Sequence, residues 1–96
     1  MPIKNKFVAQ TGVGSSEAID VHDTSDIRIS YVVIVVGTVT YSVQHSVGGD
    51  AFLANSDNTQ QTITADGNYV FPVQKIRVNV TAGAGTATLH VRQLVV

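Results

Sequence analysis

The feature that most restricts the fold of this chain is the recurrence of apolar residues at every second position in segments rich in Val, Ile, Thr and Tyr. Clusters of Gly, Asp and Asn separate these segments, and no stretch shows convincing helical periodicity. This pattern predicts an all-β chain of short strands. The expected strands cover residues 6–11, 17–21, 26–36, 38–47, 51–54, 60–65, 69–73, 75–81 and 86–94.

Nine short strands in 96 residues predict one domain, 1–96, built as a two-sheet antiparallel sandwich of jelly-roll or Greek-key type. An open barrel is the alternative. A domain of this size hides only roughly 60 to 65% of its unfolded surface, so its core is thin. The chain has no cysteine to reinforce that core, and its charged fraction of 14% is low. Both features favour a homo-oligomer.

Charge and hydropathy exclude two classes of partner. The formal net charge of -1 gives no general attraction to nucleic acid or to an anionic membrane. The longest apolar run, 31–36, has six residues, whereas a membrane-spanning helix needs roughly 20. The apolar stretch near the N-terminus is too short for the core of a signal peptide, which predicts a chain that is not exported. Residues 1–6, with Lys4 and Lys6, are expected to form a flexible arm.

The last two strands are predicted to form a hairpin that turns at 82–85. The favoured register places apolar partners together on one face, pairing Val80 with Ala87, Val78 with Leu89 and Ile76 with Val91. The same register gathers four cationic or titratable side chains on the opposite face. This predicted C-terminal cationic patch consists of Lys75, Arg77, His90 and Arg92.

Other turns are predicted where glycine and asparagine interrupt the alternation. A three-residue hairpin loop is expected at 66–68, a turn at 48–50, and a bend from one sheet to the other at Pro72. In the strand 38–47, one set of alternate side chains is expected to face inward, with His45 on the same side as Val39, Tyr41, Val43 and Val47.

No motif predicts catalysis or a cofactor. His22, His45 and His90 lack the spacing of a zinc site, and the glycine loop at 11–16 lacks the lysine of a phosphate loop. The triplet Asp20, Asp23 and Asp26 fits no EF-hand and is more simply a set of turn-capping residues, although an ion in that loop stays an open alternative. The chain is therefore expected to be a non-enzymatic protein without metal or cofactor.

Two surfaces are candidates for an interface. The unbroken run 31–36 predicts a strand covered on both faces, so Tyr31, Val33 and Val35 would face either a second subunit or a second layer of the same chain. The C-terminal cationic patch would either be solvated or meet an acidic surface of a neighbour, paired through Arg77 and Arg92.

Two stretches, Gly37–Asp50 with its Gly-Thr-Val-Thr start and Lys75–Arg92 with its Thr-Ala-Gly-Ala-Gly-Thr-Ala-Thr turn, resemble small jelly-roll structural proteins of tailed bacteriophage virions. The resemblance implies a capsid decoration or cement protein, assembled in the host cytoplasm as a trimer or larger ring, whose partners are further copies and the major capsid protein. It leaves head or tail location open. The alternatives are a tail-associated module or a carbohydrate- or receptor-binding sandwich.

Overall fold

The computed structural model describes residues 3–21, 29–47, 51–55, 59–69 and 73–94, and the regular elements in these ranges are all strands. This confirms the all-β class. The strands are β1 (Ile3–Thr11), β2 (Gly14–Ser15), β3 (Ile19–Asp20), β4 (Ile29–Val36), β5 (Thr40–Ser46), β6 (Leu53–Ala54), β7 (Ala65–Tyr69), β8 (Lys75–Ala82) and β9 (Thr86–Leu94).

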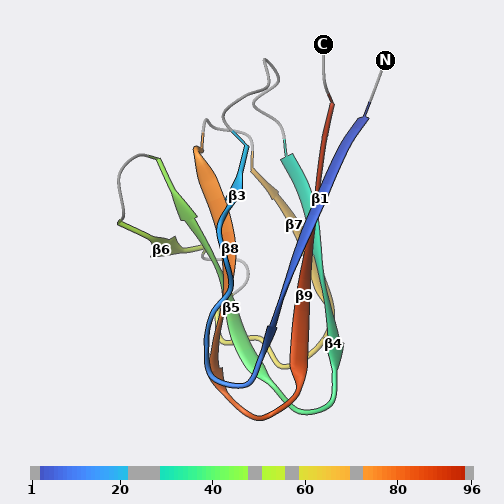
Figure 1. Ribbon diagram of the computed structural model, residues 1–96, viewed down its shortest axis with the longest axis vertical. Helices are drawn as coiled ribbons and strands as arrows, with labels where there is room; N and C mark the ends of the chain where they lie inside the picture. Colours follow the sequence, from blue (N-terminus) through green and yellow to red (C-terminus); the bar gives the residue numbers. More distant parts are fainter. Residues whose placement is uncertain (1–2, 22–28, 48–50, 56–58, 70–72, 95–96) are drawn as a thin grey trace.

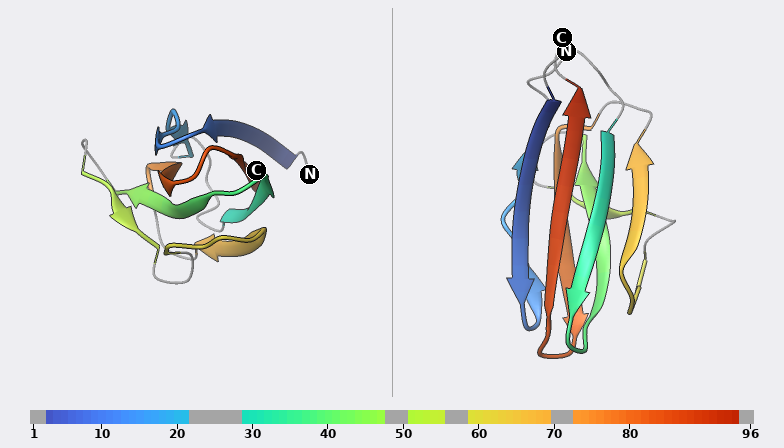
Figure 2. Two further views of the ribbon diagram at one scale, coloured as in Figure 1. Left: turned by 90° about the horizontal axis from the view of Figure 1, so that it is seen from below. Right: turned by 90° about the vertical axis from the view of Figure 1, so that its right-hand side faces the viewer.

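Two antiparallel sheets pack face to face, as the end-on view in Figure 2 shows. Sheet A has the order β1-β9-β4-β7 (Figure 2, right). Sheet B has the order β2-β8-β5-β6, and β3 also pairs with β8. The predicted two-sheet antiparallel sandwich is confirmed.

The core fills the space between the sheets with alternate residues of each strand. In β8, for example, Ile76, Val78 and Val80 are buried while the residues between them are only partly covered. The largest buried side chains are those of Tyr41, Tyr69, Ile29, Ile76 and Leu89. One continuous apolar layer therefore holds the two sheets together.

Three connections cross between the sheets at the same end of the molecule (Figure 1): β1 to β2, β4 to β5, and β8 to β9. Their backbones bond to one another, because the Gly85 amide donates to the Thr38 carbonyl at 2.9 Å and the Gly12 amide donates to the Gly85 carbonyl at 3.1 Å. A Cβ atom at Gly85 would lie 2.5 Å from the Val36 carbonyl oxygen. Glycine at position 85 thus allows the connections to lie against one another.

The register predicted for the last two strands is wrong. The turn at 82–85 exists, but it carries the chain from sheet B to sheet A, so that β8 pairs with β5 and β9 lies between β1 and β4. The apolar residues chosen for the predicted register are all buried. They meet across the sandwich instead of side by side in one sheet, an arrangement that satisfies the same alternation.

The turn predicted at Asp66, Gly67 and Asn68 is also wrong. These residues lie within β7, an edge strand that pairs with β4. Asp66 and Asn68 are exposed while Tyr69 is buried, so polar residues here occupy the solvent side of an edge strand. The chain does change sheets between β7 and β8, as expected, although Pro72 itself lies outside the described residues.

The prediction for the strand 38–47 is confirmed at Val39, Tyr41 and Val43, which are buried, but wrong at Val47, which is 72% exposed. Ser42 and Ser46, in the alternate set expected to face solvent, are both buried, and the Ser42 hydroxyl accepts a hydrogen bond from the Gln60 amide at 2.9 Å. The expected strand 60–65 is reduced to a single bridge between Gln61 and Tyr41. The predicted turn at 48–50 lies outside the described residues.

The N-terminal segment expected as a flexible arm is part of a strand from residue 3 onward. β1 begins at Ile3 and pairs along its whole length with β9, with Asn5 opposite Arg92 and Lys6 opposite Val91. The loop at 11–16 contains the sheet crossover and then β2, which was not predicted.

Candidate functional site

The outer face of sheet A is the most distinctive surface of the described chain. Because successive side chains of a strand point to opposite sides, the registers of β1, β9, β4 and β7 define its rows. From one end of the face to the other, the rows are Asn5, Arg92, Ser30 and Asn68; then Phe7, His90, Val32 and Asp66; then Ala9, Thr88 and Ile34; and finally Thr11, Thr86 and Val36.

A stripe of aliphatic side chains runs along the middle of this face. Val32, Ile34 and Val36 all project outward from β4, and we call them the β4 stripe. Val32 is partly covered, whereas Ile34 is 44% and Val36 is 68% exposed. An aliphatic row on a solvent-facing sheet surface is typical of a contact site.

Phe7 adds an aromatic side chain on β1, separated from this stripe by His90 of β9. Its ring stacks on the imidazole of His90, with centroids 5.6 Å apart and planes at 28°. Phe7 nevertheless remains 69% exposed. A large ring held in a fixed orientation and still open to solvent offers contact area at little cost in side-chain entropy.

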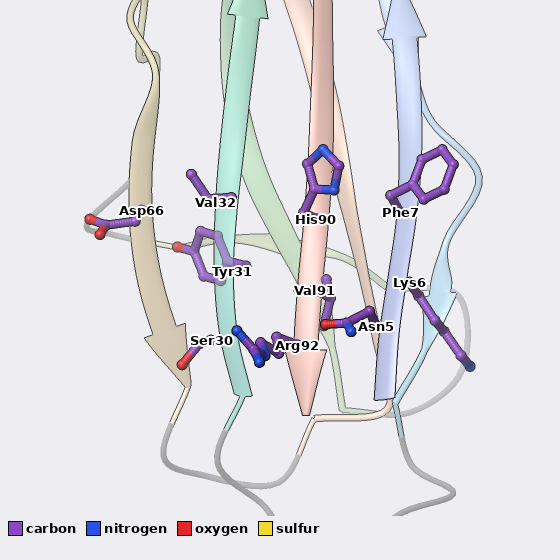
Figure 3. A pocket seen from close by; sticks show the side chains of 10 residues that line it. All are labelled: Asn5, Lys6, Phe7, Ser30, Tyr31, Val32, Asp66, His90, Val91 and Arg92. Atoms are coloured by element: carbon purple, nitrogen blue, oxygen red, sulfur yellow. The ribbon is translucent and has the colours of Figure 1, made fainter. Parts of the chain in front are cut away.

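Charged groups lie on both sides of the β4 stripe. A depression of about 360 Å³ spans the strands here, and Figure 3 shows Asp66 on one side of Val32 and His90 on the other. Arg92 lies one row away from His90 on β9. The face thus carries basic side chains on β9, aliphatic ones on β4 and a carboxylate on β7, which supply the interactions of a binding surface.

Comparison with known proteins finds no matching family model and no matching curated protein. Among solved structures, the fold resembles a subunit of the Bacillus endospore appendages, described as a novel family of disulfide-linked pili. The TM-score is 0.51 at 17% identity, with 99% of this chain and 88% of that chain covered. At this identity the similarity shows the fold alone.

The expected place among bacteriophage virion proteins is therefore wrong. The fold resembles an appendage subunit, which removes the basis for a capsid decoration or cement role, for the alternative tail or carbohydrate-binding module, for a capsid protein partner and for a virion location. The segments that carried the resemblance have a simpler explanation. Their glycines, such as Gly37 and Gly85, serve the crossovers between sheets, and their threonines alternate along sandwich strands.

The predicted C-terminal cationic patch does not form. His90 and Arg92 lie on the outer face of sheet A, whereas Lys75 and Arg77 belong to β8 in sheet B. Arg77 is engaged within its own sheet: its Nε donates to the Gln44 Oε1 at 2.8 Å, and its guanidinium lies 3.9 Å from the centroid of the Phe52 ring. The patch was wrong because the predicted hairpin placed two strands of different sheets side by side.

The residues of β4 that were expected at an interface lie on the core side of the strand. Tyr31 and Val33 are 3% and 0% exposed and belong to the core, and Val35 packs against it. The core therefore covers that side of the strand, and the aliphatic residues left outside are those of the β4 stripe. The interface role of β4 stays a prediction, but these three residues cannot form its exposed side.

His45 lies at a polar point between the sheets. Its Nδ1 is 3.1 Å from the hydroxyl of Tyr69, and the two rings meet edge to face with centroids 5.0 Å apart. Burial lowers the pKa of His45. Burial also raises the pKa of Tyr69 to about 12, against the opposing effect of a hydrogen bond with the Asn55 side chain. The expectation of a hydrogen-bonded inward histidine is confirmed.

Candidate metal ligands do not gather in the described part of the chain. No group of three or more His, Cys, Asp or Glu side chains there could hold an ion. His22, Asp23 and Asp26 lie outside the described residues, so the loop that also contains Asp20 is untested. Within the same described ranges, no helix is long and apolar enough to cross a membrane.

Sequence reasoning missed Phe7, Asp66 and the β4 stripe as residues of one sheet face. Hydrophobicity alone favours buried positions for Phe7 and the stripe. A signal was present in Ser30, because a polar residue at an outward position predicts that 32, 34 and 36 also face outward. No comparable signal marks Asp66, whose neighbours in the sequence favour a turn.

Proposed function

We propose that this protein is a structural subunit that binds further copies of itself, through the outer face of sheet A among other contacts, and so builds an extended fibre. The observation that carries the proposal is the exposed apolar surface on that face, formed by Phe7 and the β4 stripe. A monomer that keeps such a surface in water carries an aggregation risk, and a specific contact removes it.

The similarity in fold supports a fibre rather than a closed ring. The similar solved structure is a subunit of a pilus, so a sandwich of this kind can serve as a repeating unit. The described chain also has surfaces beyond one face to offer to neighbours, because Val13 and Ile63 are exposed elsewhere. A subunit needs at least two contact surfaces to form a fibre.

The assembly proposed for this chain is non-covalent. The similar pili are disulfide-linked, but this chain has no cysteine, so its own residues cannot form such links. Contacts between its subunits must therefore come from apolar burial, hydrogen bonds and charge. Assembly should be reversible on dilution and insensitive to reducing agents.

Electron microscopy of the purified protein, with light scattering over a range of concentrations, tests the proposal. We expect regular fibres at high concentration, the same fibres in the presence of a thiol reductant, and disassembly on dilution. A protein that stays monomeric at millimolar concentration, or that forms only amorphous aggregate, would contradict the proposed function.

A further inference from the structure

We propose that two copies of this chain pair through the outer faces of sheet A about a two-fold axis that runs along β4. The pair rests on the proposed self-association and specifies its first contact: the β4 stripe of one copy packs on the β4 stripe of the other. The occupant of this face is therefore a second copy of the same chain.

The arrangement of side chains on the face is self-complementary about this axis. A two-fold axis along β4 places Val32, Ile34 and Val36 against their own symmetry mates. Because β9 and β7 lie on either side of β4, the same operation places β9 of one copy over β7 of the other. Aliphatic residues of one copy then contact aliphatic residues of the other, and β9 of each copy lies over β7 of its mate.

Charge supports this axis. His90 and Asp66 occupy the same row on opposite sides of Val32, so the rotation brings His90 of each copy over Asp66 of its mate. Arg92, one row away on β9, reaches the same carboxylate diagonally. Each pair gains two such contacts. An axis along β9 would instead stack Arg92 on its own copy, so repulsion disfavours it.

The area is that of a weak contact, suited to repetition in a polymer. β4 overlaps along its eight residues, whereas β7 and the β9 strand above it overlap only along the five residues of β7. With strands about 4.8 Å apart, this covers about 285 Å² per copy, or about 570 Å² for the pair. Stable dimers bury roughly 1,200 to 2,000 Å² in total. We therefore expect the isolated pair to form at high concentration and to be reinforced by other contacts in the assembly.

Cysteine cross-linking tests the axis directly, because the natural chain contains no cysteine. In the variant Ile34→Cys the new thiols of two copies face each other on the axis across sheets about 10 Å apart, which is too far for a direct disulfide, so a short bis-maleimide linker should give a covalent dimer in high yield. Ala54→Cys is the matched control, since Ala54 is exposed on β6 of sheet B. The control should give at least about tenfold less dimer at the same concentration.

Charge exchange between two variants tests the pairing of β9 with β7. Arg92→Glu and Asp66→Lys should each weaken association about tenfold, because like charges then face each other in both contacts. An equimolar mixture of the two variants should associate like the natural chain. In the mixed pair, one contact joins the two substituted side chains, whose charges are exchanged but still opposite, and the other joins the natural Arg92 and Asp66. A contact within one chain would not be repaired by mixing.

Circular dichroism and thermal melting establish that each variant is folded before its association is measured. If the natural chain associates but Ile34→Cys cross-links no better than the control, or the mixture stays as weak as its components, the two-fold pair is wrong while self-association stands. If the natural chain does not associate at all, the proposed function fails and the pair fails with it.

Discussion

At the scale of single residues, glycine decides whether the crossovers can pack. Gly85 contacts the β4–β5 connection so closely that a Cβ would meet the Val36 carbonyl oxygen, whereas Gly12 has a positive φ of 73° but open space around its missing side chain. Position 85 thus requires glycine for lack of space, whereas position 12 favours glycine because of its backbone conformation. Both are glycine, yet the sequence alone does not distinguish them.

Gly85→Ala should therefore destabilise the fold more than Gly12→Ala. Overpacking against fixed backbone costs about 1 to 3 kcal/mol and sometimes more, and Gly85→Ala should lie at the upper end of that range. Gly12→Ala should cost about 1 kcal/mol, because alanine adopts left-handed backbone less readily than glycine. Urea unfolding of both variants measures the difference, and equal losses would show that the crossovers do not pack as described.

The polar contact between His45 and Tyr69 predicts how stability depends on pH. Burial lowers the pKa of His45, so the unfolded chain binds more protons below its ordinary value of 6.5 and stability should fall as the pH drops below about 6.5. The pKa of Tyr69 is raised to about 12, so the folded chain keeps a proton that the unfolded chain loses, and stability should also fall as the pH rises above 10.0.

Thermal melting across pH checks this dependence. His45→Asn should flatten the acid limb and leave the alkaline limb in place, while Tyr69→Phe should reduce the alkaline limb. An acid limb that is as steep in His45→Asn as in the natural chain would show that other groups cause it.

At the scale of elements, the sequence predicted the positions of the strands well but their pairing partners poorly. Alternation identified β1, β4, β5, β8 and β9 within a few residues, because period two is a local property of a half-buried strand. Pairing partners are not local. The apolar residues of β8 and β9 satisfy a hairpin and a crossover equally well, and this ambiguity produced a cationic patch that the structure divides between two sheets.

The same limit applies to the faces of β4. A run of six apolar residues does not reveal which alternate set is buried, and only Ser30 at its start indicates the answer. The residues expected at an interface, Tyr31, Val33 and Val35, therefore belong to the core side, and the exposed set is shifted by one position. The strand could be recognised from sequence, but its candidate contact side could not.

At the scale of the whole molecule, the two sheets differ in their outer faces. On sheet B, polar side chains form hydrogen bonds across neighbouring strands, as Arg77 does with Gln44 and Ser15 does with Asn79. Sheet A exposes Phe7 and the β4 stripe instead. This asymmetry is the physical basis for assigning the contact between copies to sheet A.

Sedimentation equilibrium of two matched double variants tests that assignment most directly. Ile34→Ser with Val36→Ser removes the exposed β4 stripe, while Val47→Ser with Leu53→Ser removes apolar side chains of 72% and 69% exposure elsewhere. We expect the first variant to remain monomeric at concentrations where the second variant still associates. Equal association of the two variants, or a greater loss in the second, would contradict an interface on the outer face of sheet A.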